Sequence, residues 1–120
     1  MTRKRILFMI SAAPGQGALT HEAIDAILVT AAFDQDVGVL FTGDGVLQLA
    51  PQDDGASAAA RDHAKALKAL PAYEVTRIYC DVASLDARGL ASASLALSPV
   101  VVDSLETAAL IAQHDIVMPG

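Results

Sequence analysis

The stretch Arg5-Ile6-Leu7-Phe8-Met9-Ile10-Ser11 is a short apolar run that stops at small residues before a Pro14-Gly15 turn. An apolar run of this length without polar alternation predicts a strand buried on both faces, which is typical of parallel sheets. The segment 21–33 changes to apolar positions every three or four residues, which predicts a helix capped by Thr20. Its predicted buried face consists of Ala23, Ile24, Ile27, Leu28 and Ala31. Residues 37–42 return to the strand pattern, so the three segments predict a βαβ unit.

Strand and helix patterns continue to alternate along the rest of the chain. We expect a helical turn at 46–49, a helix over 58–70 capped by Ser57, a strand over 74–80, a helical turn and loop over 84–97, a strand over 99–102, a helix to Gln113 capped by Asp103 or Ser104, and a strand over 115–118. This alternation predicts a single α/β domain over residues 1–120. The domain should be doubly wound, with helices on both faces of a mainly parallel sheet of about five strands.

The composition is that of a folded and unusually apolar chain. Of the 120 residues, 53% are hydrophobic and 18% are charged, and the mean hydropathy is +0.44. This balance excludes intrinsic disorder, which needs low hydrophobicity and high charge. No apolar run approaches the roughly 20 residues of a membrane-spanning helix, so we expect no membrane partner. The surplus apolar surface is expected to be buried against other subunits.

The charge and the cysteine content indicate which binding partners and which cellular compartment to expect. A net charge of −6 and a pI near 4.7 argue against direct binding of nucleic acid, whose phosphates are bound by clustered Lys and Arg. Arg3-Lys4-Arg5 resembles the start of a signal peptide, but the apolar run over 6–10 is too short for one. We therefore expect no export. A single cysteine, which cannot form an intramolecular disulfide, is consistent with a cytoplasmic location.

Ligands of parallel α/β sheets bind at the carboxyl ends of the strands, which are residues 11–17, 42–45 and 80–84 here. Gly15-Gln16-Gly17 begins like a dinucleotide fingerprint, but Thr20 stands where the third glycine is required. No lysine follows to complete a phosphate-binding loop. A tight turn is therefore favoured over a nucleotide site, and a small-ligand site on this loop is the weakest of the functional hypotheses.

Asp44 lies between two glycines and has the chemistry of a metal ligand or a general base. A metal site needs several ligands, and no His or Cys lies near Asp44 in sequence. A turn or helix-capping role is therefore favoured. His21, His63 and His114 are far apart and are interpreted as surface or helix-end residues. We expect neither a metal nor a cofactor.

Cys80 is the candidate catalytic residue, at the carboxyl end of a predicted strand and just before a predicted helical turn. A helix N-terminus lowers the pKa of a thiol and favours the reactive thiolate. The negative charge of Asp81 acts in the opposite direction, and no His is placed by sequence to serve as a base. Two interpretations remain: a buried cysteine that packs as a small apolar residue, and a reactive thiol.

Short motifs follow the predicted strands in a fixed order. They are Ser11-Ala12-Ala13-Pro14, Phe41-Thr42-Gly43-Asp44-Gly45-Val46 with its continuation Leu47-Gln48-Leu49, Ala83-Ser84-Leu85-Asp86-Ala87-Arg88-Gly89-Leu90, and Asp115-Ile116-Val117. Together they resemble the DsrE/DsrF/TusBCD sulfur-relay family, and most closely its TusC/DsrF branch. The similarity covers essentially the whole chain.

The resemblance implies a flavodoxin-like α/β subunit in a hetero-oligomer with related TusB/TusD (DsrH/DsrE)-like chains. Such a complex takes persulfide sulfur from a sulfur-donor protein and passes it towards tRNA, where 2-thiouridine is made at the wobble position. In sulfur-oxidising bacteria the related complex serves dissimilatory sulfur metabolism. The resemblance also implies that the main sulfur-carrying cysteine belongs to the TusD/DsrE chain.

The position of Cys80 separates two hypotheses. In the family pattern the cysteine stands eight residues before the glycine of the Arg-Gly pair, a position that Asp81 holds here, so Cys80 lies one residue early. On a strand, such a shift turns the side chain to the opposite face. The leading hypothesis is an accessory, non-catalytic subunit of a sulfurtransferase complex. The alternative is a sulfurtransferase that carries persulfide on its own Cys80.

Overall fold

The computed structural model describes residues 3–14, 18–51, 55 and 57–119. Within these residues a sheet of five parallel strands has the order β4-β3-β2-β1-β5. The strands are β1 (Arg5–Ile10), β2 (Asp36–Phe41), β3 (Arg77–Asp81), β4 (Val100–Val102) and β5 (Ile116–Pro119). The α-helices are α1 (Ala18–Ala32), α2 (Ala58–Lys68), α3 (Val82–Ala87) and α4 (Ser104–Ala112), and the 3-10 helices are η1 (Gly43–Leu49), η2 (Leu70–Tyr73) and η3 (Ser92–Ser94). The predicted doubly wound α/β class is confirmed.

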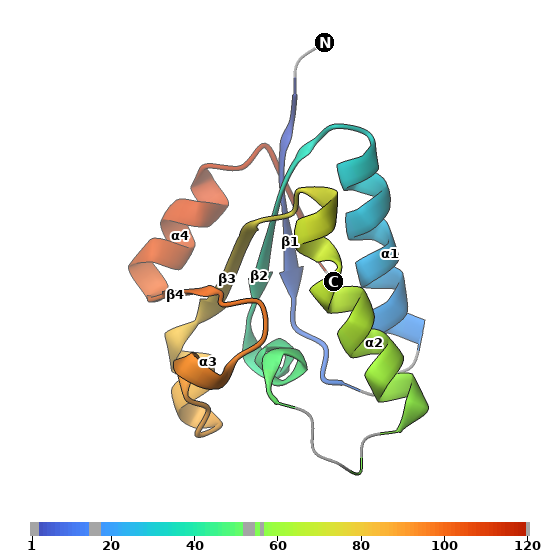
Figure 1. Ribbon diagram of the computed structural model, residues 1–120. Helices are drawn as coiled ribbons and strands as arrows, with labels where there is room; N and C mark the ends of the chain where they lie inside the picture. Colours follow the sequence, from blue (N-terminus) through green and yellow to red (C-terminus); the bar gives the residue numbers. More distant parts are fainter. Residues whose placement is uncertain (1–2, 15–17, 52–54, 56, 120) are drawn as a thin grey trace.

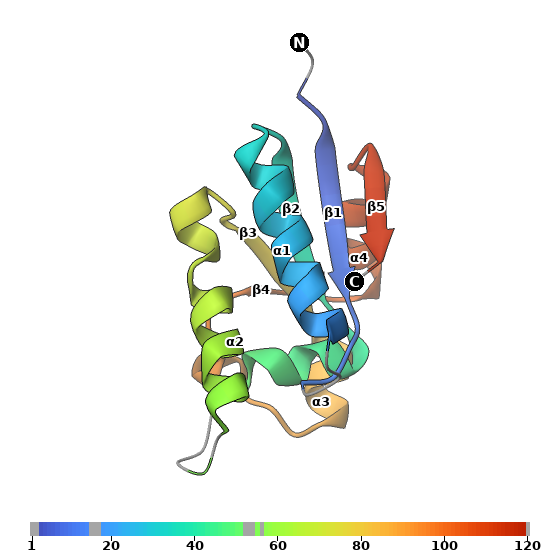
Figure 2. The same cartoon turned by 90° about the vertical axis from the view of Figure 1, so that its right-hand side faces the viewer.

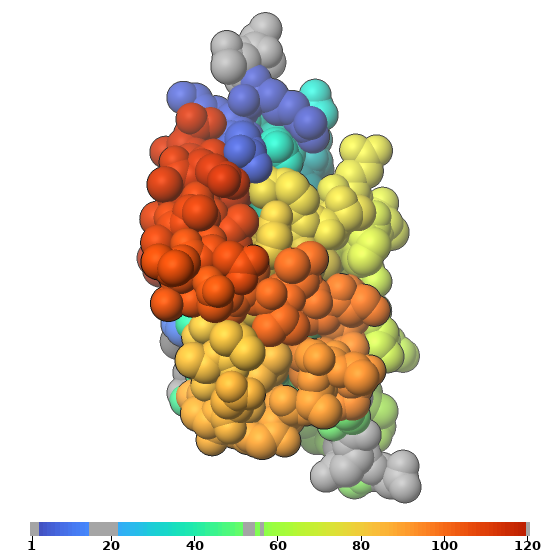
Figure 3. All heavy atoms as spheres, turned by 90° about the vertical axis from the view of Figure 1, so that its left-hand side faces the viewer, coloured from blue at the N-terminus to red at the C-terminus, as the bar shows by residue number. Residues whose placement is uncertain are grey.

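The helices lie on both sides of the sheet, as Figure 1 shows. From β1 to β4 the chain steps along the sheet in one direction, and α1 and α2 pack side by side on one face. The connection through α4 then crosses the opposite face, because β5 pairs with β1 at the far edge. Right-handed crossovers explain this change of face, since a reversed step along the sheet places the helix on the other side. In Figure 3, α4 is the upper orange-red segment.

The core is divided by the sheet into two clusters, which explains the continuous apolar strands. The larger cluster lies beneath α1, α2 and η1 and includes Ile10, Phe41 and Ile27, each no more than 1% exposed. The smaller cluster lies beneath α4 and consists of Leu7, Leu40, Val102 and Leu110. Successive residues of a strand point to opposite faces, so a strand that packs on both sides needs apolar residues at both.

The helix boundaries confirm most of the predicted caps and correct one. The Ser57 Oγ accepts a hydrogen bond from the Ala60 amide at 3.1 Å, and so caps α2. Asp103 forms a capping box with Glu106 at the start of α4. The predicted cap at Thr20 was wrong, because α1 already begins at Ala18. Ala and Leu have high helix propensity, so the helix begins three residues earlier than predicted.

A polar cluster ties β2 and β3 to the segment that precedes β5, at the amino ends of the sheet. Arg77 on β3 forms an ion pair with Asp36 of β2, with 3.0 Å between Nη2 and Oδ1. The Arg77 Nη1 lies 2.9 Å from the His114 Nε2, and the His114 Nδ1 bonds to the carbonyl oxygen of Leu110. Because a guanidinium only donates, the His114 Nε2 accepts and its Nδ1 carries the proton. Gly38 leaves room for this contact, since a Cβ there would lie 3.0 Å from the Arg77 Nη1.

The histidines were expected at the surface or at helix ends, and the structure corrects part of this. His114 follows the end of α4, but it is only 9% exposed. His63 lies inside α2, and its Nε2 is 2.8 Å from the Gln48 Oε1. The side chain of His21 lies outside the described residues. Among the residues that the structure describes, no helix is long and apolar enough to cross a membrane.

Replacement of Arg77 by Met should lower the free energy of unfolding by about 2–3 kcal/mol. The reason is that His114 loses a charged hydrogen-bond donor, and such a bond contributes roughly 1.5–3 kcal/mol. The ion pair with Asp36 adds little, because the Asp36 side chain is 33% exposed. The matched control is Arg3→Met, since the ion pair of Arg3 with Asp34 is long, at 3.9 Å, and both side chains are more than half exposed. That control should change stability by less than about 0.5 kcal/mol. Urea denaturation measures both, and equal effects would contradict the assignment.

Candidate functional site

The carboxyl ends of β2 and β3 lie next to each other and are joined by an ion pair. Asp44, in the first turn of η1, accepts hydrogen bonds from Arg88 through its Oδ1, at 2.7 Å from Nη2 and 3.2 Å from Nε. The Arg88 Nη1 also donates to the carbonyl oxygen of Ser84 in α3, at 3.0 Å. Arg88 therefore ties η1 to α3. Asp44 is a turn residue with a basic partner, which agrees with the favoured interpretation.

A second link runs through the hydroxyl of Ser84, which is 7% exposed. The Ser84 Oγ donates to the Asp81 Oδ2 at 2.6 Å and accepts from the Gly43 amide at 2.9 Å. It thereby joins the start of η1 to the residue that precedes α3. We refer to Gly43, Asp44, Asp81, Ser84 and Arg88 as the polar bridge.

The end of β1 is held against the same place by a close backbone contact. A Cβ built on Gly45 would lie 2.0 Å from the carbonyl oxygen of Ile10, so only glycine fits there. The Gln48 side chain, 8% exposed, donates through Nε2 to the carbonyl oxygen of Ala12 at 2.8 Å. All three strand ends singled out from the sequence therefore meet around η1. The Gly15-Gln16-Gly17 segment lies outside the described residues.

Cys80 lies beneath this meeting point and is fully buried, with 0% exposure. It pairs in register with Phe41 and Val101, and it packs in the larger core cluster. Burial raises the pKa of the Cys80 thiol above its ordinary value of 9.0, and the nearby Asp81 charge raises it further. The site therefore keeps Cys80 as a neutral thiol without access to solvent, although α3 begins at Val82, just after it.

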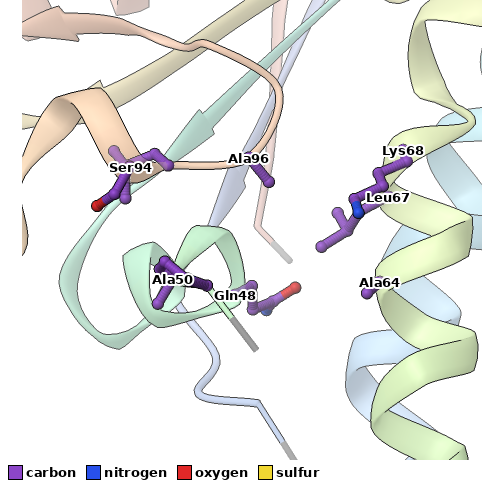
Figure 4. Close-up of a pocket in the computed structure, with 9 residues that line it drawn as sticks. Gln48, Ala50, Ala64, Leu67, Lys68, Ser94 and Ala96 are labelled. Carbon is purple, nitrogen blue, oxygen red and sulfur yellow. The ribbon is translucent and has the colours of Figure 1, made fainter. Parts of the chain in front are cut away.

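A cavity of about 330 Å³, whose lining does not include Cys80, lies between η1 and α2 (Figure 4). Gln48 lines it from η1, Leu67 and Lys68 line it from α2, Ser94 lines it from η3, and Ala96 lines it from the segment that follows η3. Lys68 is the charged residue of this lining. The described part of the chain has no group of three or more His, Cys, Asp or Glu side chains that could hold a metal ion.

Sequence reasoning located the three strand ends but missed the residues that connect them. Arg88 and Ser84 were seen only as parts of a motif, and no partner was assigned to either. Their partners Asp44 and Gly43 lie 44 and 41 residues away in sequence. One feature of the sequence could have indicated these contacts. The segments that contain Asp44 and Arg88 each follow a predicted strand, and the carboxyl ends of neighbouring parallel strands lie at one edge of the sheet.

Fold and site together define a small, wholly parallel α/β subunit whose strand-end loops are closed over a buried thiol. The model of the DsrE/DsrF-like family matches residues 4–119. The chain belongs to this family.

Individual relatives show which branch of the family this chain resembles. The chain is 39% identical to Protein TusC of Klebsiella pneumoniae subsp. pneumoniae over 100 residues, which cover 83% of this chain and 81% of that one. It is 37% identical to the Protein TusC homolog of Pseudomonas aeruginosa over 110 residues, 92% of each chain. The crystal structure of the ychN protein from E. coli has the same fold, with a TM-score of 0.75 over 99% of this chain and 100% of that one, at 16% identity. The resemblance to the TusC/DsrF branch is thereby confirmed.

Replacement of Gly45 by Ala should destabilise the fold by at least the roughly 1–3 kcal/mol that is typical of overpacking, because its Cβ would meet backbone atoms of β1 that cannot move aside. The matched control is Gly89→Ala, where φ is +64° and no atom lies within 4 Å. That control should cost only about 1–2 kcal/mol for the left-handed backbone. Thermal or urea denaturation distinguishes the two, and a smaller effect at Gly45 would contradict the close approach.

Cys80 should react with a thiol reagent at least roughly tenfold more slowly in the native protein than in denaturant, because the thiolate is the reactive form and it is disfavoured here. Since the folded-state pKa lies above 9.0, the native state keeps a proton that the unfolded state loses at higher pH. Stability should therefore fall as pH rises above 9.0, and Cys80→Ala should remove that part of the decline. Equal reaction rates at pH 8 in native and denatured protein would contradict the burial.

Proposed function

We propose that this chain is the accessory, non-catalytic subunit of a sulfurtransferase complex that relays persulfide sulfur. Membership in the family makes it a TusC/DsrF-like subunit of the sulfur relay for tRNA thiolation, in a complex with other Tus/Dsr proteins. The finer assignment, that its own cysteine carries no sulfur, is our inference. The observation that carries it is the complete burial of Cys80.

Sulfur relay requires an exposed thiolate. Transfer occurs when a thiolate attacks the outer sulfur of a persulfide on another protein, and the rate depends on thiolate content and on access. Cys80 lacks both, because it is 0% exposed and its pKa is raised by burial and by the charge of Asp81. The polar bridge also fixes α3 over the end of β3. A partner's persulfide therefore has no route to Cys80 in this conformation.

The exposed apolar side chains fit a scaffolding role. Large hydrophobic residues that are more than half exposed are Val29, Phe33, Tyr73, Val100 and Leu105. They lie on α1, after α1, on η2, on the edge strand β4 and on α4. Large exposed apolar surfaces mark protein interfaces. We infer that TusB/TusD (DsrH/DsrE)-like chains cover part of this surface, while the sulfur-donor protein engages the complex through the cysteine-bearing chain.

Charge and cysteine content extend the proposal to the substrate and the compartment. The net charge of −6 leaves tRNA contact to other subunits, because the affinity for phosphates comes from Lys and Arg. A chain with one buried free thiol is suited to the reducing cytoplasm, where we place it. The alternative, a sulfurtransferase that carries persulfide on Cys80, would require α3 to open first.

Cys80→Ala should preserve function in cells that lack their own TusC-type chain. Co-expressed with TusB- and TusD-like chains, the variant should co-purify in a complex of wild-type size. Wobble 2-thiouridine in digested tRNA, measured by mass spectrometry, should stay within about twofold of wild type, since a residue outside the transition state leaves the rate unchanged. The matched control is alanine at the cysteine of the TusD-like chain, which should abolish thiolation while the complex persists.

Two results would overturn the non-catalytic assignment. One is an intact complex with Cys80→Ala that makes no 2-thiouridine. The other is a gain of one sulfur atom on Cys80 after incubation of the complex with a cysteine desulfurase and cysteine. A stable chain that fails to bind the TusD-like partner would overturn the scaffolding role itself.

A further inference from the structure

The cavity between η1 and α2 lies on the side of the molecule where the strands end. Gln48 and Ala50 line it from the segment that follows β2, and Figure 2 shows η1, in green, beside α2 and below the arrowhead of β1. Ligands of parallel α/β sheets bind beyond the carboxyl ends of the strands. The volume of about 330 Å³ falls within the range of small-ligand sites, roughly 300–1,000 Å³. Position and size are therefore those of a ligand site.

Hydrogen bonds between segments far apart in sequence hold the walls of this cavity. The Gln48 Nε2 donates to the carbonyl oxygen of Ala12 at 2.8 Å, and the Gln48 Oε1 lies 2.8 Å from the Nε2 of His63 in α2. The Ala96 amide donates to the carbonyl oxygen of Leu49 at 2.9 Å. These bonds tie α2 and the segment after η3 to η1. The cavity is therefore preformed, so that a ligand spends little of its binding energy on ordering the walls.

Much of the lining is apolar, and small side chains leave the space open. Leu67 and Leu95 are 1% and 8% exposed and belong to the larger core cluster. Ala50, Ala64 and Ala96 contribute short side chains to the same lining. Apolar atoms that face an empty space lose contacts and lower the stability of the fold. A bound aliphatic group would restore these contacts.

Lys68 brings a positive charge to the cavity. In Figure 4 its side chain extends from α2 towards the space between η1 and the helix. The four ion pairs between described residues all use arginine, and no described carboxylate pairs with Lys68. In a chain with a net charge of −6, a lysine without an acidic partner is available to an anion from outside.

We propose that this cavity binds a small aliphatic carboxylic acid, with its carboxylate at Lys68 and its hydrocarbon chain against Leu67 and Leu95. A cavity of about 150 Å³ already holds a benzene molecule, so the larger space here accepts a chain of roughly six carbons. An inorganic anion would leave the apolar walls without contacts. A neutral hydrocarbon would leave the ammonium group of Lys68 unpaired. An aliphatic carboxylate matches both parts of the lining.

The site is separate from the features that support the proposed function. Its lining contains neither Cys80 nor any residue of the polar bridge. A chain that binds no carboxylate would still be able to serve as the accessory subunit, and a chain with a reactive Cys80 would still be able to bind one. The two proposals therefore fail on different measurements.

Hexanoate is the probe that tests the site, in a titration of the isotope-labelled full-length chain followed by its backbone amide NMR signals. The signals of residues 48–50, 64–68 and 94–96 should move together. The dissociation constant should lie in the millimolar range expected for a ligand of about eight non-hydrogen atoms. Hexylamine, which has the same chain and a positive charge, should leave these signals in place.

The role of the charge is tested by Lys68→Met. This variant should weaken hexanoate binding by about fivefold or more, because it removes the ion pair and keeps the length of the side chain. The matched control is Lys65→Met, which removes the same charge from an exposed position of α2 outside the lining. That control should change the dissociation constant by less than about twofold, because salt screens a charge that does not touch the ligand.

The role of the space is tested by Ala64→Leu. The larger side chain should occupy the volume of the hydrocarbon chain and weaken hexanoate binding by at least about tenfold. Ala59→Leu is the control, since it makes the same change at an exposed position of α2 outside the lining. Thermal melts of both variants verify that they fold. If Ala64→Leu does not fold, Lys68→Met at its exposed position still decides the proposal.

Three results would overturn the inference. They are a titration in which hexanoate moves none of these signals, binding that Lys68→Met and Lys65→Met weaken equally, and binding of hexylamine as tight as that of hexanoate. Saturation-transfer NMR of hexanoate with the co-purified complex adds a further test. A signal that Lys68→Met abolishes supports a site for a free acid. Loss of the signal in the wild-type complex would overturn it and assign the cavity to a side chain of a partner.

Discussion

The close approach of Gly45 to the end of β1 is the constraint on which the strand-end region depends. With no Cβ at this position, η1 can turn directly beneath the carbonyl oxygen of Ile10. Only then can Gly43 donate to the Ser84 Oγ and Asp44 reach Arg88. The close approach of Gly45 to Ile10 packs η1 against the end of β1, and the polar bridge holds α3 against η1. A larger residue would separate η1 from β1 and open the route to the thiol beneath.

Burial of Cys80 is the feature that supports the proposed non-catalytic role of this chain. Two features of Cys80 disfavour the thiolate: the desolvation that comes with complete burial, and the charge of Asp81. The one feature that favours a thiolate is the adjacent start of α3, a helix of six residues whose dipole is correspondingly small. Desolvation therefore dominates. A cysteine in this environment packs like a small apolar side chain, which supports the proposal that the subunit contributes its surface to the relay.

The fold followed from the sequence because both faces of a parallel sheet are buried, so that uninterrupted apolar runs such as 5–11 and 37–42 mark strands. What could not be predicted depends on strand order. Arg77 meets His114, 37 residues away, only because the chain crosses over the sheet through α4 before β5 pairs with β1. Periodicity carries no information on this crossing. Local propensity also failed at Thr20, where the preceding residues simply continue the helix.

The apolar surplus of the composition is distributed unevenly in the folded chain. Most apolar residues of the inner strands lie in the interior. The exposed apolar residues occur at the two edges of the sheet and along α1, η2 and α4. These exposed residues belong to separate elements of the chain and do not come from one continuous segment. Contacts with them depend on side-chain packing, so the shape and the apolar area of the opposing surface decide the fit.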